Sequence, residues 1–232
     1  MRAVFDHPLF FKITVNLKYE LLAVCRCYQD MIYPLLFLIL VIVLFPLSVS
    51  PDPVLLNKIS AGIFWIVVLF LVLLMLDQLF RNDWKEGDLE QLILTPNALS
   101  LAIFIKLLVF CLAISLPLIV MTPFLSLCLY IPIRALKTLC WSIFLGTPSL
   151  IFLGGIARAL TLGLRHSGLL IVLIVIPFYI PVLIFASSAV SFASMGSSAN
   201  GPLAWLSVLM LLSVSLSPLV IRMILRLGIA FV

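Results

Sequence analysis

Long stretches without a charged residue divide this chain into apolar segments. No Asp, Glu, Lys or Arg occurs in five runs, at residues 31–51, 59–76, 107–133, 138–157 and 167–221. A helix needs about 20 apolar residues to cross a bilayer, so the last run must hold two helices, divided by a polar break at 187–202. The pattern predicts an all-α integral membrane protein with six transmembrane helices, at about 35–50, 60–76, 98–129, 137–158, 168–187 and 203–222.

The segment before the first span has a different pattern, with apolar residues on one face of a helix and polar residues on the other. The apolar positions recur at steps of three and four, as in an amphipathic helix: Phe10, Ile13, Leu17, Leu21, Val24 and Tyr28. We therefore expect a surface helix over residues 8–30, lying along the membrane before Pro34 introduces the first span. Charged residues interrupt this segment, which excludes a cleavable signal peptide.

A short stretch between the second and third spans, "DQLFRNDWKEGDLEQL" (residues 77–92), gathers the acids of the chain. It contains five of the nine Asp and Glu residues. Gly87 is a typical helix stop, and Asp88 is a typical N-cap for a second helix, with Gln91 completing a capping box. The stretch therefore predicts two short helices with a break between them.

The apolar residues of this stretch also follow a helical spacing. Phe80 and Trp84 lie four residues apart and face the same way on a helix, while Leu89 and Leu92 form a stripe in the second helix. We expect a short amphipathic helix at the membrane surface that docks a partner protein. A solvated loop that only keeps its charges out of lipid is the alternative.

The distribution of Lys and Arg predicts the orientation. With the N-terminus in the cytoplasm, eleven basic residues fall on the cytoplasmic side and three on the far side, namely Lys58, Arg134 and Lys137. This satisfies the positive-inside rule, which the inverse topology fails. Both termini and the acidic loop are therefore expected in the cytoplasm. The net charge of +5 is scattered along the chain, so nucleic-acid binding is not expected.

Catalytic and cofactor motifs are absent from the sequence. None of the ten glycines precedes a lysine, so the chain has no P-loop for ATP. Only His7 and His166 could offer imidazole ligands, and the five cysteines show neither zinc nor redox spacing. We expect no catalytic residue, no metal site and no directly bound cofactor. Ion-driven transport is disfavoured too, because the spans contain no acidic residue that could carry a proton.

Small residues and prolines mark particular spans. The stretch "LGTPSLIFLGG" (residues 145–155) in the fourth span lets another helix approach closely and is expected to form an interhelical or intersubunit contact. Prolines occur inside three other spans, at Pro117, Pro123, Pro177, Pro181 and Pro218. They suit a transporter that changes conformation, or simple packing kinks.

These features together resemble an ABC-2-type permease, and several motifs are similar to the CcmB (haem exporter protein B) family of cytochrome c maturation. The family pattern F-x-x-D-x-x-x-G-x-LEQL is matched by Phe80, Asp83, Gly87, Leu89, Glu90, Gln91 and Leu92. Further similar segments are "LFPLSVSPDPVLL" (44–56), "GIFWIVVLF" (62–70), "LGTPSLIFLG" (145–154), "ALTLGLRHSGLL" (159–170) and "PFYIPVLIFA" (177–186). At Arg158 the chain departs from the small residue expected before the fourth of these segments.

The resemblance implies a cell inner-membrane permease subunit, itself not an enzyme, whose ATP is hydrolysed by a separate CcmA-type ATPase. Further implied partners are CcmC, CcmD, the haem chaperone CcmE and a second copy of the chain. The implied role is release of the haem-loaded chaperone, or haem export. The expected ATPase-coupling residues are Phe80, Asp83, Trp84, Gly87, Asp88, Leu89, Glu90, Gln91 and Leu92. A generic ABC-2 permease for a drug or glycolipid, and a membrane enzyme acting on lipid, are the alternatives.

Overall fold

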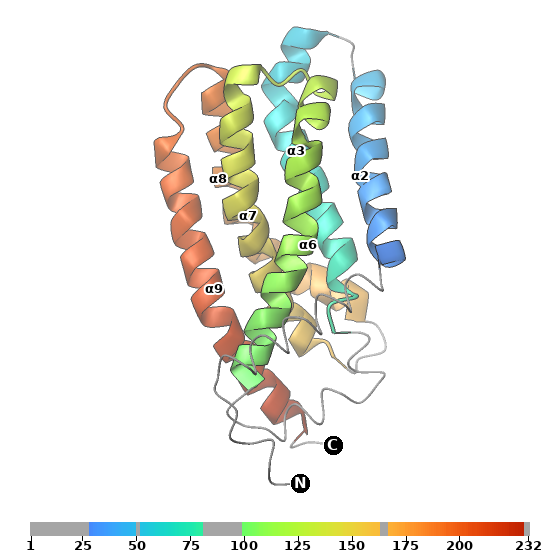
Figure 1. Ribbon diagram of the computed structural model, residues 1–232, viewed down its shortest axis with the longest axis vertical. Coiled ribbons are helices and arrows are strands. Elements are labelled where there is room, and N and C mark those ends of the chain that lie inside the picture. The colour runs from blue at the N-terminus through green and yellow to red at the C-terminus, as the bar shows by residue number, and fades with distance from the viewer. Residues whose placement is uncertain (1–27, 50–51, 81–98, 163–166, 230–232) are drawn as a thin grey trace.

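The computed structural model describes residues 28–49, 52–80, 99–162 and 167–229. These residues form six long helices joined by short connections. The helices are α2 (Tyr28–Val49), α3 (Pro53–Leu76), α6 (Leu99–Cys128), α7 (Ile133–Leu160), α8 (Ser167–Ser194) and α9 (Asn200–Ile229). Successive helices run in opposite directions along the length of the molecule (Figure 1).

Each helix contains a segment that is long and apolar enough to cross a membrane, from 18 to 30 residues in length. At 1.5 Å per residue these segments extend about 27–45 Å, which matches or exceeds a hydrocarbon core of about 30 Å. The prediction of an all-α protein with six spans is confirmed. The start of α2 and the ends of α3 and α9 lie at one end of the bundle, called here the loop end (Figure 1); the other is called the opposite end.

Two predicted boundaries were wrong. Residues 28–30, expected in the surface helix, form the first turn of α2, and Pro34 lies inside that helix. Proline has no backbone N–H, so Pro34 leaves only the carbonyl of residue 30 without its helical hydrogen bond. Residue 30 lies in the first turn of the helix, away from the middle of the span, where an unpaired carbonyl costs least. The rest of the expected surface helix, residues 8–27, lies outside the described residues.

The polar break expected at 187–202 is narrower in the structure, because α8 continues to Ser194. The serines in this stretch do not disrupt the helix, since their hydroxyls donate to carbonyls of their own helix. Ser187 donates to the Leu183 carbonyl at 2.7 Å, and Ser194 to the Ser191 carbonyl at 2.7 Å. The chain turns away just after the helix at Gly196, which has a φ of 79°, a conformation that glycine adopts without strain.

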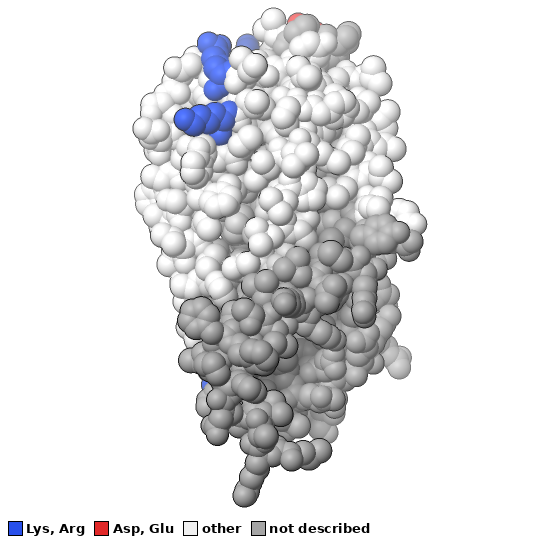
Figure 2. All heavy atoms as spheres, in the orientation of Figure 1, with Lys and Arg blue, Asp and Glu red and all other residues white. Residues whose placement is uncertain are grey.

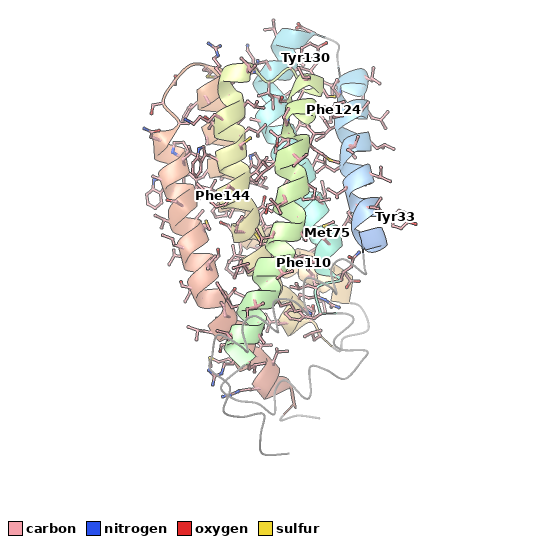
Figure 3. All side chains as sticks on the ribbon, in the orientation of Figure 1. Tyr33, Met75, Phe110, Phe124, Tyr130 and Phe144 are labelled. Atoms are coloured by element: carbon pink, nitrogen blue, oxygen red, sulfur yellow. The ribbon has the colours of Figure 1, made fainter. Side chains whose placement is uncertain are left out.

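Helix α7 is the centre of the bundle and packs against α3, α6, α8 and α9. Its small residues permit this: Gly146 lies under the ring of Trp65 from α3, and Gly154 contacts Leu76 of α3 and the Tyr179 hydroxyl of α8. The stretch 145–155 is thus an interhelical contact, as predicted. In contrast α2 is peripheral, with Tyr33 directed away from the bundle while Met75 of α3 lies between helices (Figure 3).

Candidate functional site

The root of the acidic loop is a tight turn that follows α3. Asp77 caps the helix, the Gln78 amide donates to the Met75 carbonyl at 3.0 Å, and the Leu79 amide donates to the Leu76 carbonyl at 3.2 Å. The two residues that follow Gln78 turn back into the bundle, and both Leu79 and Phe80 are buried. The loop therefore leaves the membrane domain from a fixed, apolar anchor.

This anchor rests on α7 at a position where four helices meet. Gly155 of α7 has no side chain, and the space that a Cβ would take is bordered by Leu79, by Leu107 of α6 and by Ile221 of α9. A displacement of Leu79 would therefore be felt by three other helices at once, because close-packed side chains leave no free space to absorb it.

One ion pair joins the same two elements. A terminal guanidinium nitrogen of Arg158, near the end of α7, lies 3.4 Å from a carboxylate oxygen of Asp77. The Arg158 side chain is 8% exposed and the Asp77 side chain 47% exposed. A guanidinium so deeply buried is costly without an opposite charge, so Asp77 stabilises both Arg158 and the approach of α3 to α7. The departure from the family pattern at Arg158 thereby has a structural role in this chain.

A second polar contact ties helices together at the loop end. The Arg222 guanidinium of α9 donates to the Ser100 hydroxyl of α6 at 3.3 Å. Ser100 lies at the second residue of α6, the helix that follows the acidic loop. Both ends of the loop therefore continue into helices that carry an arginine contact to α7 or α9.

Of the nine predicted coupling residues, the structure describes only Phe80, which is 1% exposed. Asp83, Trp84, Gly87, Asp88, Leu89, Glu90, Gln91 and Leu92 lie outside the described residues. Phe80 was expected on an exposed docking face beside Trp84, but its burial makes it part of the anchor instead. The ring of Phe80 belongs to the apolar core of the bundle, together with the side chain of its neighbour Leu79.

Sequence reasoning missed Asp77 and Arg158 as a pair. A usable signal was present: the second and fourth spans both run toward the loop end, so charges at their ends reach the same membrane face. Among the described residues no group of three His, Cys, Asp or Glu could hold a metal ion. The middle of the described surface shows no charged side chain on the face in Figure 2, where Lys and Arg gather mainly near the opposite end.

The six apolar spans define a multi-pass α-helical membrane protein. Comparison with known proteins identifies its family. The family model described as "CcmB protein" matches residues 11–228, so the chain belongs to the CcmB family.

Curated relatives share much of the sequence. The chain is 43% identical over 188 residues to the heme exporter protein B of Pseudomonas aeruginosa, covering 81% of this chain and 84% of that relative. It is 42% identical over 212 residues to the heme exporter protein B of Haemophilus influenzae and 38% identical over 212 residues to that of Escherichia coli K12; each alignment covers 91% of this chain and 96% of the relative.

Proposed function

We propose that this chain is the membrane permease subunit of an ATP-driven complex for haem export and cytochrome c biogenesis. The names of its relatives support the cargo, and the absence of a P-loop from the whole sequence supports an ATPase on a separate chain. The permease would work with a CcmA-type ATPase, with CcmC and CcmD, and with the haem chaperone CcmE. Its role would be to change conformation when the ATPase hydrolyses ATP, and the chain itself would not be an enzyme.

The observation that carries the proposal is the anchoring of the acidic loop on α7. Closure of an ATPase dimer displaces whatever segment it holds. If residues 81–98 are that segment, the displacement passes through buried Leu79 and Phe80, and through the pair of Asp77 with Arg158, to the central helix. A loop that served only to keep charges in water would need no such anchor.

We further propose that the loop end faces the cytoplasm of a bacterial cell. Seven basic residues belong to sequence segments that precede α2, join α3 to α6 or join α7 to α8, and Lys106, Arg158, Arg222 and Arg226 lie in the helices. Three basic residues lie toward the opposite end. Because Lys and Arg are retained on the cytoplasmic side, both termini and the ATPase would share that side.

The outward surfaces of the bundle leave room for partners within the membrane. Only 17% of the residues in the α2 span are buried, and 28% in those of α8 and α9, compared with 61% and 67% in α3 and α7. Lipid, CcmC, CcmD and a second copy of the chain would cover these apolar faces.

A pull-down of the candidate ATPase with the tagged membrane protein in detergent tests the coupling role. Wild type is compared with Glu90→Lys, which reverses one charge in the loop, and with the control Asp52→Lys, which makes the same change at the exposed start of α3 at the opposite end. We expect the wild type and the control to retain the ATPase and Glu90→Lys to lose at least tenfold of it. Equal retention by all three proteins would remove the docking role from the loop.

A second experiment tests the cargo. Deletion of the gene should abolish c-type cytochromes and leave tolerance to drugs unchanged; the reverse would identify a generic ABC-2 permease. Vesicles that contain the whole complex then separate the two proposed outputs. Release of haem-loaded CcmE that requires ATP, without ATP-dependent haem entry into the vesicle lumen, would assign the energy to the chaperone, and haem entry would assign it to transport.

A further inference from the structure

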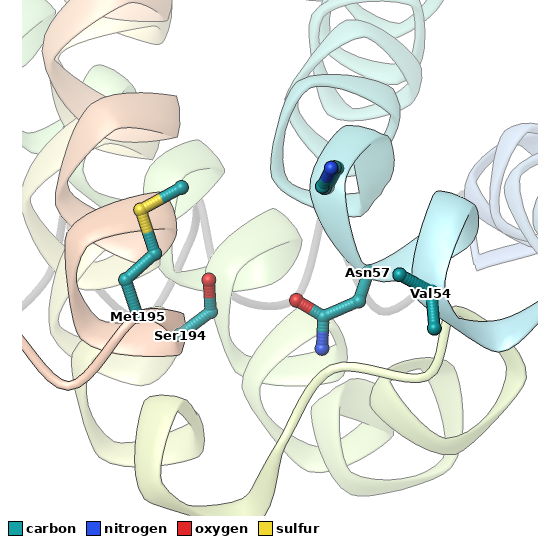
Figure 4. Close-up of a pocket in the computed structure, with 5 residues that line it drawn as sticks. Val54, Asn57, Ser194 and Met195 are labelled. Atoms are coloured by element: carbon teal, nitrogen blue, oxygen red, sulfur yellow. The ribbon is translucent and has the colours of Figure 1, made fainter.

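A cavity of about 390 Å³ opens between the start of α3 and the end of α8, at the end of the bundle opposite the acidic loop. It is lined by Val54, Asn57 and Lys58 from α3, by Ser194 at the end of α8 and by Met195, which follows that helix (Figure 4). Its volume lies in the range of small-molecule sites. Because both helices are long enough to span a membrane, their ends lie at the level of lipid headgroups.

The walls of this cavity are held in place by backbone structure. The Ser197 amide donates to the Phe192 carbonyl at 2.9 Å and closes the end of α8 around Gly196. On the other side the side-chain Nδ2 of Asn57 donates to the Tyr130 carbonyl at 3.1 Å, which ties α3 to the turn between α6 and α7. Tyr130 itself has a φ of 54°, a conformation that few residues with a side chain adopt. These hydrogen bonds hold the backbone on the two sides of the cavity.

The electrostatic character of the cavity favours an anion. The described residues provide no acidic partner for Lys58, Arg134 or Lys137, the three basic residues of this end. Arg134 extends to within 3.6 Å of the Cβ position at Gly196, next to Met195. The acid nearest in sequence, Asp52, is engaged with the Val54 amide at 3.1 Å as the cap of α3. An ammonium at a cavity mouth binds phosphate through charge-assisted hydrogen bonds.

The remaining polar atoms narrow the choice of anion. Ser194 uses its hydroxyl proton on the Ser191 carbonyl, so its oxygen is left as an acceptor. Asn57 keeps one amide proton as a donor and its carbonyl oxygen as an acceptor, and the two side chains are directed toward each other across the cavity (Figure 4). A ligand that suits this set has a phosphate for Lys58, a hydroxyl that donates to Asn57 or Ser194, and an apolar part for Val54 and Met195.

We propose that this cavity binds the headgroup of an anionic, hydroxyl-bearing phospholipid of the phosphatidylglycerol class. The phosphate lies at Lys58, the headgroup hydroxyl is bound between Asn57 and Ser194, and an acyl chain follows the apolar surface beside Val54 and Met195. Phosphatidylethanolamine suits the site less well, because it has no net negative charge to offset the positive charges of Lys58 and Arg134. A site of this kind holds the ends of α3 and α8 together with a lipid.

The test uses the full-length protein, purified in detergent and depleted of lipid, with native mass spectrometry to count bound lipids. Phosphatidylglycerol, phosphatidylethanolamine and the soluble headgroup analogue glycerol phosphate are added separately. Wild type should retain one phosphatidylglycerol and bind phosphatidylethanolamine at least fivefold less. Lys58→Gln should lower phosphatidylglycerol occupancy at least tenfold, whereas Lys137→Gln, which removes the same charge outside the cavity, should stay within twofold of wild type.

A second variant guards against effects of charge alone. Val54→Trp fills the cavity from an exposed position and should abolish the bound lipid with Lys58 intact. Equal occupancy in Lys58→Gln and Lys137→Gln, or full occupancy in Val54→Trp, would overturn the site. Displacement of the lipid by glycerol phosphate at equal concentration would overturn a lipid ligand and leave a site for free phosphate esters.

Discussion

The pair of Asp77 and Arg158 makes the sharpest quantitative prediction. An exposed ion pair contributes about 0.2–1 kcal/mol, and removal of one partner from a buried pair costs about 3–5 kcal/mol. Here the arginine is buried and the aspartate is 47% exposed, so water screens one side of the pair. Asp77→Asn keeps a hydrogen-bond acceptor and loses the charge, and we expect it to lower the free energy of unfolding by about 1–2 kcal/mol.

A double-mutant cycle isolates this contribution. Arg158→Gln alone should cost about 1–3 kcal/mol, since it also removes the packing of the long side chain. If the two groups interact as the structure shows, the loss of stability in the double variant should be smaller than the sum of the two single losses, by at least about 1 kcal/mol. The measurement is reversible unfolding in mixed micelles, followed by circular dichroism.

The control for this cycle is Asp52→Asn, which removes the same charge at the opposite end of α3. Asn caps a helix about as well as Asp, so the contact with the Val54 amide survives and stability should change by less than about 0.5 kcal/mol. Strictly additive losses in the cycle, or equal effects of Asp77→Asn and Asp52→Asn, would refute the argument that Asp77 neutralises a buried guanidinium.

Three further predictions follow from the packing and the topology. Gly154→Ala should lower stability by about 1–3 kcal/mol, because its Cβ would overlap Leu76 and the Tyr179 hydroxyl, whereas Gly62→Ala, with open space around it, should be neutral or stabilising in the same unfolding assay. Tyr179→Phe loses the 2.6 Å hydrogen bond to the Leu150 carbonyl and should cost about 1 kcal/mol, while exposed Tyr33→Phe should cost nothing measurable. In a cysteine-free background, Ser197→Cys should react with a membrane-impermeant maleimide in intact cells and Arg226→Cys only after permeabilisation; the opposite result would reverse the proposed orientation.

The spans could be predicted from the sequence because a charged side chain inside a bilayer costs free energy. Spans therefore appear in the sequence as long runs without charged residues. The helix ends could not be predicted in the same way. They lie where polar and apolar environments meet, and local hydrogen bonds decide at which residue a helix stops. The serine-rich stretch that begins at Ser187 was predicted to be a loop. The hydroxyls of Ser187 and Ser194 donate to carbonyls of their own helix, so α8 continues to Ser194. Phe80 was predicted on a docking face for a similar reason. Its helical spacing fits an amphipathic surface, while its burial depends on the packing of helices that are distant in the sequence, which the spacing does not show.

The central place of α7 follows from a difference between membrane and water-soluble proteins. In water, large apolar residues gain most from burial, but in a membrane they do not. Lipid solvates Leu and Phe as well as a protein interior does, so small and hydroxyl-bearing residues gain most from burial between helices. The span of α7 contains Gly146, Thr147, Ser149, Gly154 and Gly155, and 67% of its residues are buried, compared with 28% in the leucine-rich and isoleucine-rich span of α8. The composition that makes α7 the least lipid-like span also makes it the contact partner of four other helices. Asp77 and Leu79 contact this helix at Arg158 and Gly155, so under the proposed coupling role a displacement of the loop would reach four other helices through α7.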